Sequence, residues 1–148
     1  MNHIEYMRLA IEQAQAAALR GEVPVGAVVV LEERVVAAAG NRTIVDCDPT
    51  AHAEIVALRA AALAVGNYRL TGAALYVTIE PCAMCAGALV QARIARLIYG
   101  ADDAKGGAVR TCMQVLDAGA LNHRVEAISG ILAEESIALL QSFFAARR

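Results

Sequence analysis

Four residues combine the types and the spacing of a catalytic metal site. His52 and Glu54 stand in the segment Thr-Ala-His-Ala-Glu, and Cys82 and Cys85 stand in Glu-Pro-Cys-Ala-Met-Cys. One imidazole and two thiolates are ligands that zinc prefers. Three protein ligands leave the fourth tetrahedral position free for water, whereas a structural zinc site usually has four. We therefore predict a catalytic site for one zinc ion per chain.

The chemistry expected of such a site is the activation of water. Zinc lowers the pKa of a bound water toward neutrality and so supplies a nucleophile at pH 7. Glu54, two residues after the histidine, is placed to take the proton of that water and to pass it on. The pattern H-x-E…P-C-x-x-C is the known signature of zinc deaminases that act on cytosine or adenine. We interpret the four residues as the centre of a nucleobase deaminase.

Hydrophobic periodicity predicts the elements that must position these residues. Apolar side chains recur at helical spacing near the N-terminus, whereas the continuous run over 25–31 is rich in β-branched residues and indicates a strand buried on both faces. Strands that alternate with helices predict an α/β sandwich around a mixed sheet. The expected helices span 3–20, 51–64 and 82–92, and the expected strands span 25–31, 35–39, 75–79, 94–99 and 125–128.

The end of the chain is predicted to form an amphipathic helix. Ile137, Leu140 and Phe144 recur at helical spacing and are expected to face inward. The residues expected to face solvent are Glu134, Glu135 and Gln141.

Composition and charge favour a single domain over residues 1–148 without a membrane span. The length suits one domain, and no apolar run reaches the ~20 residues that a span needs. Four cysteines are too few and too unevenly spaced for a disulfide framework, which favours the reducing cytosol. Cys47 and Cys112 lack partners at metal spacing. The formal net charge of −2 gives no global positive field, so composition argues neither for nor against a nucleic-acid substrate.

At these residues, and well beyond them, the chain resembles the tRNA-specific adenosine deaminases of bacteria, within the cytidine deaminase-like superfamily. The resemblance implies a three-layer α/β/α fold with a mixed five-stranded sheet and a cytoplasmic homodimer with one Zn²⁺ per subunit. It also implies deamination of the wobble adenosine of an arginine tRNA to inosine within the anticodon stem-loop. The segments that match in family order are 22–27, 41–42, 48–54, 67–70, 75–87, 103–105, 122–126 and 130–132.

The resemblance implies substrate contacts as well. Asn41 would hydrogen-bond the flipped base, and the backbone N–H of Ala53 would help to hold the group at the reacting carbon. Further contacts are implied for Val25 in the pocket wall, for Asp103 and Lys105 beside the ribose and backbone, and for Asn122, His123 and Arg124 in a second RNA-contacting segment.

Two features depart from the family pattern. Gly40 stands where the family commonly has an aromatic residue, and we expect it to alter packing under the base pocket. The chain stops at Arg147 and Arg148, where the family often continues into a lysine-rich tail. We expect this difference to lower RNA affinity through weaker counterion release.

Three alternatives remain open at this point. The first is a deaminase of a free nucleobase such as guanine or cytosine, which would share the fold and the metal site. The second is a non-catalytic, zinc-stabilised binding module, in which the metal only holds two helices together. The third is a thiol-disulfide enzyme that uses Cys82 and Cys85 and needs no metal.

Overall fold

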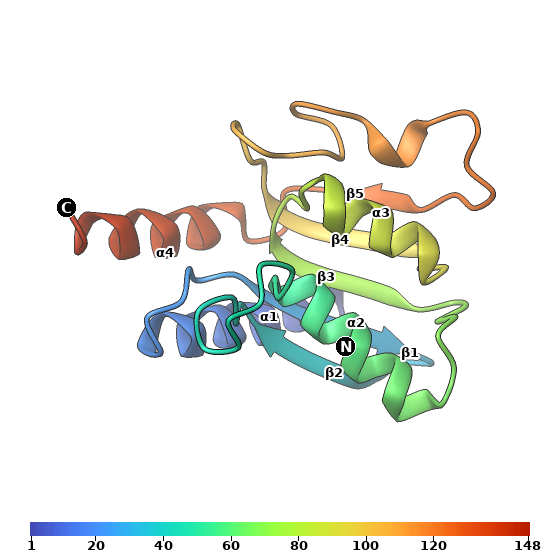
Figure 1. The fold of residues 1–148 in the computed structure, drawn as a ribbon, viewed down its shortest axis with the longest axis horizontal. Coiled ribbons are helices and arrows are strands. Elements are labelled where there is room, and N and C mark those ends of the chain that lie inside the picture. Colours follow the sequence, from blue (N-terminus) through green and yellow to red (C-terminus); the bar gives the residue numbers. More distant parts are fainter.

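The structure is a computed structural model that describes residues 1–148, and its centre is a mixed sheet with helices on both faces (Figure 1). The five strands are β1 (Gly26–Leu31), β2 (Arg34–Gly40), β3 (Ala74–Ile79), β4 (Arg96–Ala101) and β5 (Glu126–Ile128). They lie in the order β2-β1-β3-β4-β5; β1 is antiparallel to β2 and β3, while β3, β4 and β5 are parallel. The carboxyl ends of β3 and β4 therefore meet at one edge of the sheet.

Two pairs of helices cover the two faces, as the predicted three-layer sandwich requires. The helices are α1 (His3–Leu19), α2 (Ala53–Val65), α3 (Ala83–Gln91) and α4 (Ala133–Ala145), with a 3₁₀ turn at Val115–Asp117. Side chains alternate along β1: Ala27 and Val29 share a core with α2 and α3, whereas Val28 and Val30 share one with α1. The fold is thus α/β/α, and β1 is buried on both faces. None of its helices is both long and apolar enough to cross a membrane.

The helices and strands of the prediction begin and end within two residues of the observed bounds. The turn expected at 32–34 is tighter than predicted, because Arg34 already belongs to β2. Glu32 and Glu33 form the turn with φ angles of 51° and 62°. Two central residues with positive φ are typical of a type I′ turn, whose twist matches that of the paired strands.

Helix α1 lies close to the sheet because small residues face one another across the interface. Ala10 and Ala17 belong to its buried stripe, while Ile4 at its first turn is exposed. On the sheet, Gly26 and Gly40 lie where an added Cβ atom would collide with the α1 backbone. The surplus of alanine therefore serves close helix-to-sheet packing.

Replacing Gly40 with alanine is expected to lower the free energy of unfolding by about 1–3 kcal/mol. The new Cβ would lie 2.7 Å from the carbonyl oxygen of Gln13 and 2.9 Å from the Cβ of Ala17, so the helix backbone must move. Urea denaturation measures the change. Gly119→Ala is the matched control, since nothing lies within 4 Å of its added Cβ. Equal stability of the two variants would contradict the close packing.

The inner face of α4 differs from the prediction. Ser136 and Phe143 are its buried residues, whereas Ile137 and Phe144 are 41% and 45% exposed. The helix approaches β4 at Gly100, where an added Cβ would lie 2.8 Å from the Ser136 hydroxyl oxygen. A contact between two small residues, invisible to hydrophobic periodicity, thus selects the face that packs on the sheet.

Candidate active site

The predicted metal ligands stand at the N-termini of two neighbouring helices. His52 is the N-cap residue of α2 and Cys82 is that of α3, both in extended backbone conformation. Neither side chain makes the usual capping hydrogen bond, so both are free to turn toward a shared centre. Cys85 lies in the first turn of α3, completely buried. The positive end of a helix dipole favours thiolates at such positions.

The three ligand atoms have the spacing of a tetrahedral metal site. The Nδ1 atom of His52 lies 3.6 Å from Sγ of Cys82 and 3.5 Å from Sγ of Cys85. All three atoms lie within 4.8 Å of one another. Bond lengths of about 2.3 Å to sulfur and about 2.0 Å to nitrogen, at a tetrahedral angle, place the two ligand atoms about 3.5 Å apart. The site fits a metal ion of the size and ligand preference of zinc, held through Nδ1 of the histidine.

The protonation of the three ligands is coupled. Hydrogen bonds from Cys85 and His52 lower the pKa of Cys82 to about 3, so this thiol is ionised at neutral pH. Its hydrogen bond with Cys82, together with burial, raises the pKa of Cys85. The hydrogen bond to Cys82 also raises the pKa of His52. Since metal ligands must be deprotonated, binding of a cation at this site releases protons.

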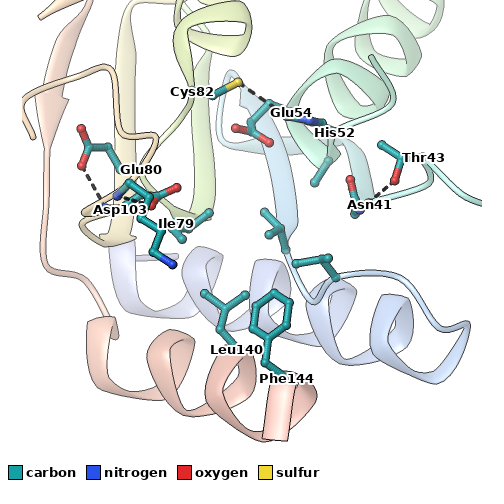
Figure 2. Close-up of a pocket in the computed structure, with 14 residues that line it drawn as sticks. Asn41, Thr43, His52, Glu54, Ile79, Glu80, Cys82, Asp103, Leu140 and Phe144 are labelled. Carbon is teal, nitrogen blue, oxygen red and sulfur yellow. Dashed lines mark hydrogen bonds between the residues drawn. The ribbon is translucent and has the colours of Figure 1, made fainter. Parts of the chain in front are cut away.

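Glu54 lies beside this cluster in the first turn of α2, and only 3% of its surface is exposed. Burial raises the pKa of its carboxyl group above the usual value. A carboxyl whose pKa is shifted toward neutrality can both accept and return a proton during one reaction cycle. In Figure 2 the Glu54 carboxylate lies next to His52 and Cys82 at the cavity wall.

A cavity of about 580 Å³ opens at the cluster, between helix α4 and the edge of the sheet where β3 ends and β1 begins (Figure 2). This volume falls within the range of pockets that bind small molecules or single bases, roughly 300–1,000 Å³. Five of the predicted substrate contacts line it together with His52, Glu54 and Cys82: Val25, Asn41, Ala53, Asp103 and Lys105.

Asn41 is held in the cavity wall by its neighbours. Its side-chain Nδ2 donates to the Thr43 hydroxyl at 3.4 Å, and its backbone carbonyl accepts from the Arg20 guanidinium at 3.2 Å. The buried carboxylate of Glu22 accepts the backbone N–H groups of Ile44 and Val45, just after Thr43, at 2.9 to 3.2 Å. Gly40, just before Asn41, is covered by α1. Helix α1 therefore fills the space behind the part of the cavity wall that Asn41 forms.

Ala53 contributes through its backbone. It is the first residue of α2, so its N–H group has no partner within the helix. The residue also lines the cavity. An N–H group at this position is available to a polar group of a bound substrate.

The predicted second RNA-contacting segment, residues 122–124, does not line the cavity. Asn122 is exposed, and the next two side chains are engaged in holding the loop before β5. His123 Nε2 hydrogen-bonds the carbonyl of Ile94 at 2.7 Å, and Arg124 donates to the carbonyl of Ala118 at 2.7 Å. A contact of this segment with RNA stays a prediction, and it would lie outside the cavity.

The cavity also includes residues that the sequence did not single out. Leu140 and Phe144 of α4, which were predicted to face the core, instead form an apolar wall of the cavity. Thr43 and Glu80 add polar groups. The sequence did carry a signal for Glu80, because a carboxylate directly after a buried apolar strand needs donors from elsewhere in the fold.

Glu80 is the most strongly hydrogen-bonded carboxylate of the site. Burial alone raises the pKa of this group. Hydrogen bonds from Arg110, Thr111 and Asp103 outweigh the effect of burial and set the pKa at about 2. Glu80 is therefore ionised at neutral pH and cannot serve as a proton donor in the reaction.

Comparisons with known proteins agree with this site. A family model described as MafB19-like deaminase matches residues 1–148. The chain is 50% identical over 143 residues to a tRNA-specific adenosine deaminase of Haemophilus influenzae, covering 96% of this chain and 83% of that protein. A structure from studies of A-to-I editing by tRNA:A34 deaminases at the wobble position matches with a TM-score of 0.90 and 49% identity, covering 92% of this chain and 99% of that one.

A guanine deaminase from Bacillus subtilis is more distant. Its structure matches with a TM-score of 0.69 and 31% identity, covering 99% of this chain and 94% of that chain.

A mixed sheet that brings these ligands together at two helix N-termini, matched along its length by a deaminase model, defines an enzyme of the cytidine deaminase-like class. Sequence identity of 50% with a tRNA-specific adenosine deaminase, over 96% of this chain, identifies the family within this class. The chain belongs to the family of tRNA-specific adenosine deaminases.

Proposed function

We propose that this enzyme hydrolyses adenosine to inosine at the wobble position of a tRNA anticodon, with release of ammonia. The observation that carries the proposal is the cluster of His52, Cys82 and Cys85 with Glu54 beside it, at the end of a cavity of base size. The names of the 50% identical relative and of the tRNA:A34 deaminases support adenosine in tRNA as the substrate.

The metal that suits the cluster is zinc, one per chain. When bound, it would be held by one imidazole and two thiolates and would supply a water of lowered pKa as nucleophile. Glu54 takes a proton from this water and delivers it to N1 of the adenine while oxygen adds to C6. Glu54 then moves the second proton to the amine, the C6–N bond breaks, and ammonia leaves. Adenosine and one water thus become inosine and ammonia.

The other cavity residues orient the base. The Asn41 side chain hydrogen-bonds the base edge, and the Ala53 N–H holds the group at the reacting carbon. Val25 supplies an apolar wall. A base inside a paired stem cannot enter such a cavity, so the substrate must present an unstacked base, as an anticodon loop does.

The proposed partners follow from this substrate. Asp103 and Lys105 lie at the cavity wall from the loop after β4, where they would meet the ribose and the adjoining backbone. We propose the anticodon stem-loop of an arginine tRNA as the bound form, and a cytoplasmic homodimer of single-domain subunits as the active species.

Deamination of free guanine is the second candidate, favoured by the 31% identical guanine deaminase structure. A side-by-side assay decides between the two. The protein is incubated with an anticodon stem-loop and with free guanine, and the products are separated by mass spectrometry. The proposal expects inosine in the stem-loop and unchanged guanine; xanthine formed beside an unreacted stem-loop would overturn it.

Replacing Lys105 with alanine is expected to weaken stem-loop binding and to reduce the slope of log K against log salt by about 1, because one phosphate contact is lost. Titrations at several salt concentrations measure the slope. Arg34→Ala is the matched control: it removes one exposed positive charge at the end of β2 remote from Asn41. An unaltered slope for the Lys105 variant would contradict the assignment.

A further inference from the structure

The loop from residue 102 to 111 forms one side of the cavity without regular secondary structure of its own. It follows β4 and carries Asp103 and Lys105. Loops of this kind need external hydrogen-bond partners to keep a fixed shape, because their backbone groups lack a helix or a ladder. The position of the two charged side chains therefore depends on what holds this backbone.

A single carboxylate holds both ends of the loop. Glu80 follows β3, and only 1% of its surface is exposed. Its Oε1 accepts the backbone N–H of Asp103 at 3.1 Å (Figure 2). Its Oε2 accepts the N–H groups of Val109, Arg110 and Thr111 at 2.9 to 3.0 Å. The hydroxyl of Thr111 also donates to Oε1.

The loop packs tightly against the Glu80 carboxylate at Gly107. An added Cβ at Gly107 would collide with all the atoms of the Glu80 carboxyl group. The loop thus passes directly over the carboxylate, and only N–H groups and a hydroxyl surround its oxygens. The ion pairs of this loop lie elsewhere, since Arg110 pairs with Asp102 and not with Glu80.

The chain of contacts continues to the substrate side of the loop. The carboxylate of Asp103 accepts the backbone N–H groups of Lys105 and Gly106 at 3.1 and 3.2 Å. The Asp103 backbone is fixed by Glu80, and the Lys105 backbone is fixed by Asp103. A displacement at Glu80 would therefore move both charged groups of the cavity wall.

We propose that Glu80 is a positioning residue, which sets the loop from 102 to 111 so that Asp103 and Lys105 meet the sugar and backbone of the RNA. Glu80 acts on substrate binding through Lys105 and takes no part in proton transfer. The inference rests on the proposed function, because its readout is the KM for an anticodon stem-loop.

The sharpest variant is Glu80→Gln, which keeps the volume of the side chain. An amide has only one acceptor oxygen. This oxygen is expected to take the place of Oε2, where three N–H groups donate. The NH₂ group then faces the N–H of Asp103, so the link to Asp103 is lost. In the zinc-loaded protein, KM for the stem-loop is expected to rise about tenfold, with kcat within about threefold of the wild type.

A double-mutant cycle with Lys105→Ala separates positioning from general damage. If Glu80 acts through Lys105, the rise in KM caused by Glu80→Gln shrinks to less than about threefold in the Lys105→Ala background. If the two effects multiply, or if kcat falls while KM is unchanged, the proposal is overturned. Zinc content is measured for each variant, since Glu80 lies two residues before Cys82, and loss of zinc in Glu80→Gln also overturns it.

Thr111→Val serves if Glu80→Gln does not fold. It removes the hydroxyl donor and retains the four N–H bonds, so KM is expected to rise about two- to threefold with the same coupling to Lys105. An unchanged KM would overturn the proposal. Wild-type protein that leaves the stem-loop unreacted refutes the proposed function, whereas active wild type with an additive cycle refutes only the role of Glu80.

Discussion

Glu54→Gln lowers kcat on the stem-loop by at least about 10³-fold in our expectation, while zinc stays bound. Glutamine has nearly the same shape but cannot accept and return a proton. The variant therefore removes the proton transfers to N1 and to the leaving amine and leaves the three ligands intact. Single-turnover assays with the purified stem-loop measure the rate, and metal analysis of the same samples measures zinc.

The stability of the same variant provides a control. Burial raises the folded-state pKa of Glu54 above its unfolded value, so this ionisable carboxyl lowers the stability of the fold at pH values above the unfolded pKa. The cost disappears as pH falls below the unfolded pKa. A neutral glutamine removes it, so Tm at pH 7 should equal or exceed that of the wild type. Turnover at the wild-type rate in a folded, zinc-loaded variant would contradict the role of Glu54 in proton transfer.

The second large effect is expected for Cys85→Ser. Cys85 is completely buried and supplies one of the three ligand atoms. Serine binds zinc much more weakly than a thiolate does, so zinc content should fall from one per chain to a small fraction, and deamination should fall with it. Cys112→Ser is the matched control, because this exposed cysteine lies outside the cluster. Full activity of Cys85→Ser would contradict the assignment of Cys85 as a ligand, whereas full activity of metal-free wild type would favour thiol chemistry instead.

The pH dependence of zinc binding should follow the protonation of the ligands. In the metal-free site the pKa values of Cys85 and His52 are raised, so both groups keep their protons up to a higher pH than they otherwise would. Zinc displaces these protons, and its apparent affinity should rise with pH. Competition with a chelator at several pH values checks the direction. Affinity that falls as pH rises, over a range in which the protein stays folded, would contradict the assignment of ligands.

Much of the fold could be predicted because the helices and strands carry hydrophobic patterns that identify them in the sequence. The apolar run before Glu32 and the strand before Glu80 each have a length and composition typical of buried strands. The metal cluster could be predicted because its ligands lie within two short segments, at spacings fixed by the start of a helix. In the structure the two helix N-termini bring Nδ1 of His52 to within 3.5 to 3.6 Å of the two sulfur atoms.

The remaining features depend on contacts between distant parts of the chain. The inner face of α4 is selected by Ser136 against Gly100, which no hydrophobic pattern reveals. The loop after β4 is held by Glu80, about 30 residues away in sequence, through backbone donors that carry no residue-type signal. Arg124 donates a hydrogen bond to a carbonyl within its own loop. This bond competes with the RNA contact that the resemblance implies for Arg124.

The coordination of the bound metal tests the account most directly. X-ray absorption at the zinc edge, on the protein loaded with one equivalent of zinc, counts the atoms bound to the metal. The account predicts two sulfur atoms, one histidine nitrogen and one oxygen from solvent, the oxygen being replaced when a substrate analogue binds. A fourth protein ligand in place of that oxygen would leave no position for the reacting water and would contradict the account.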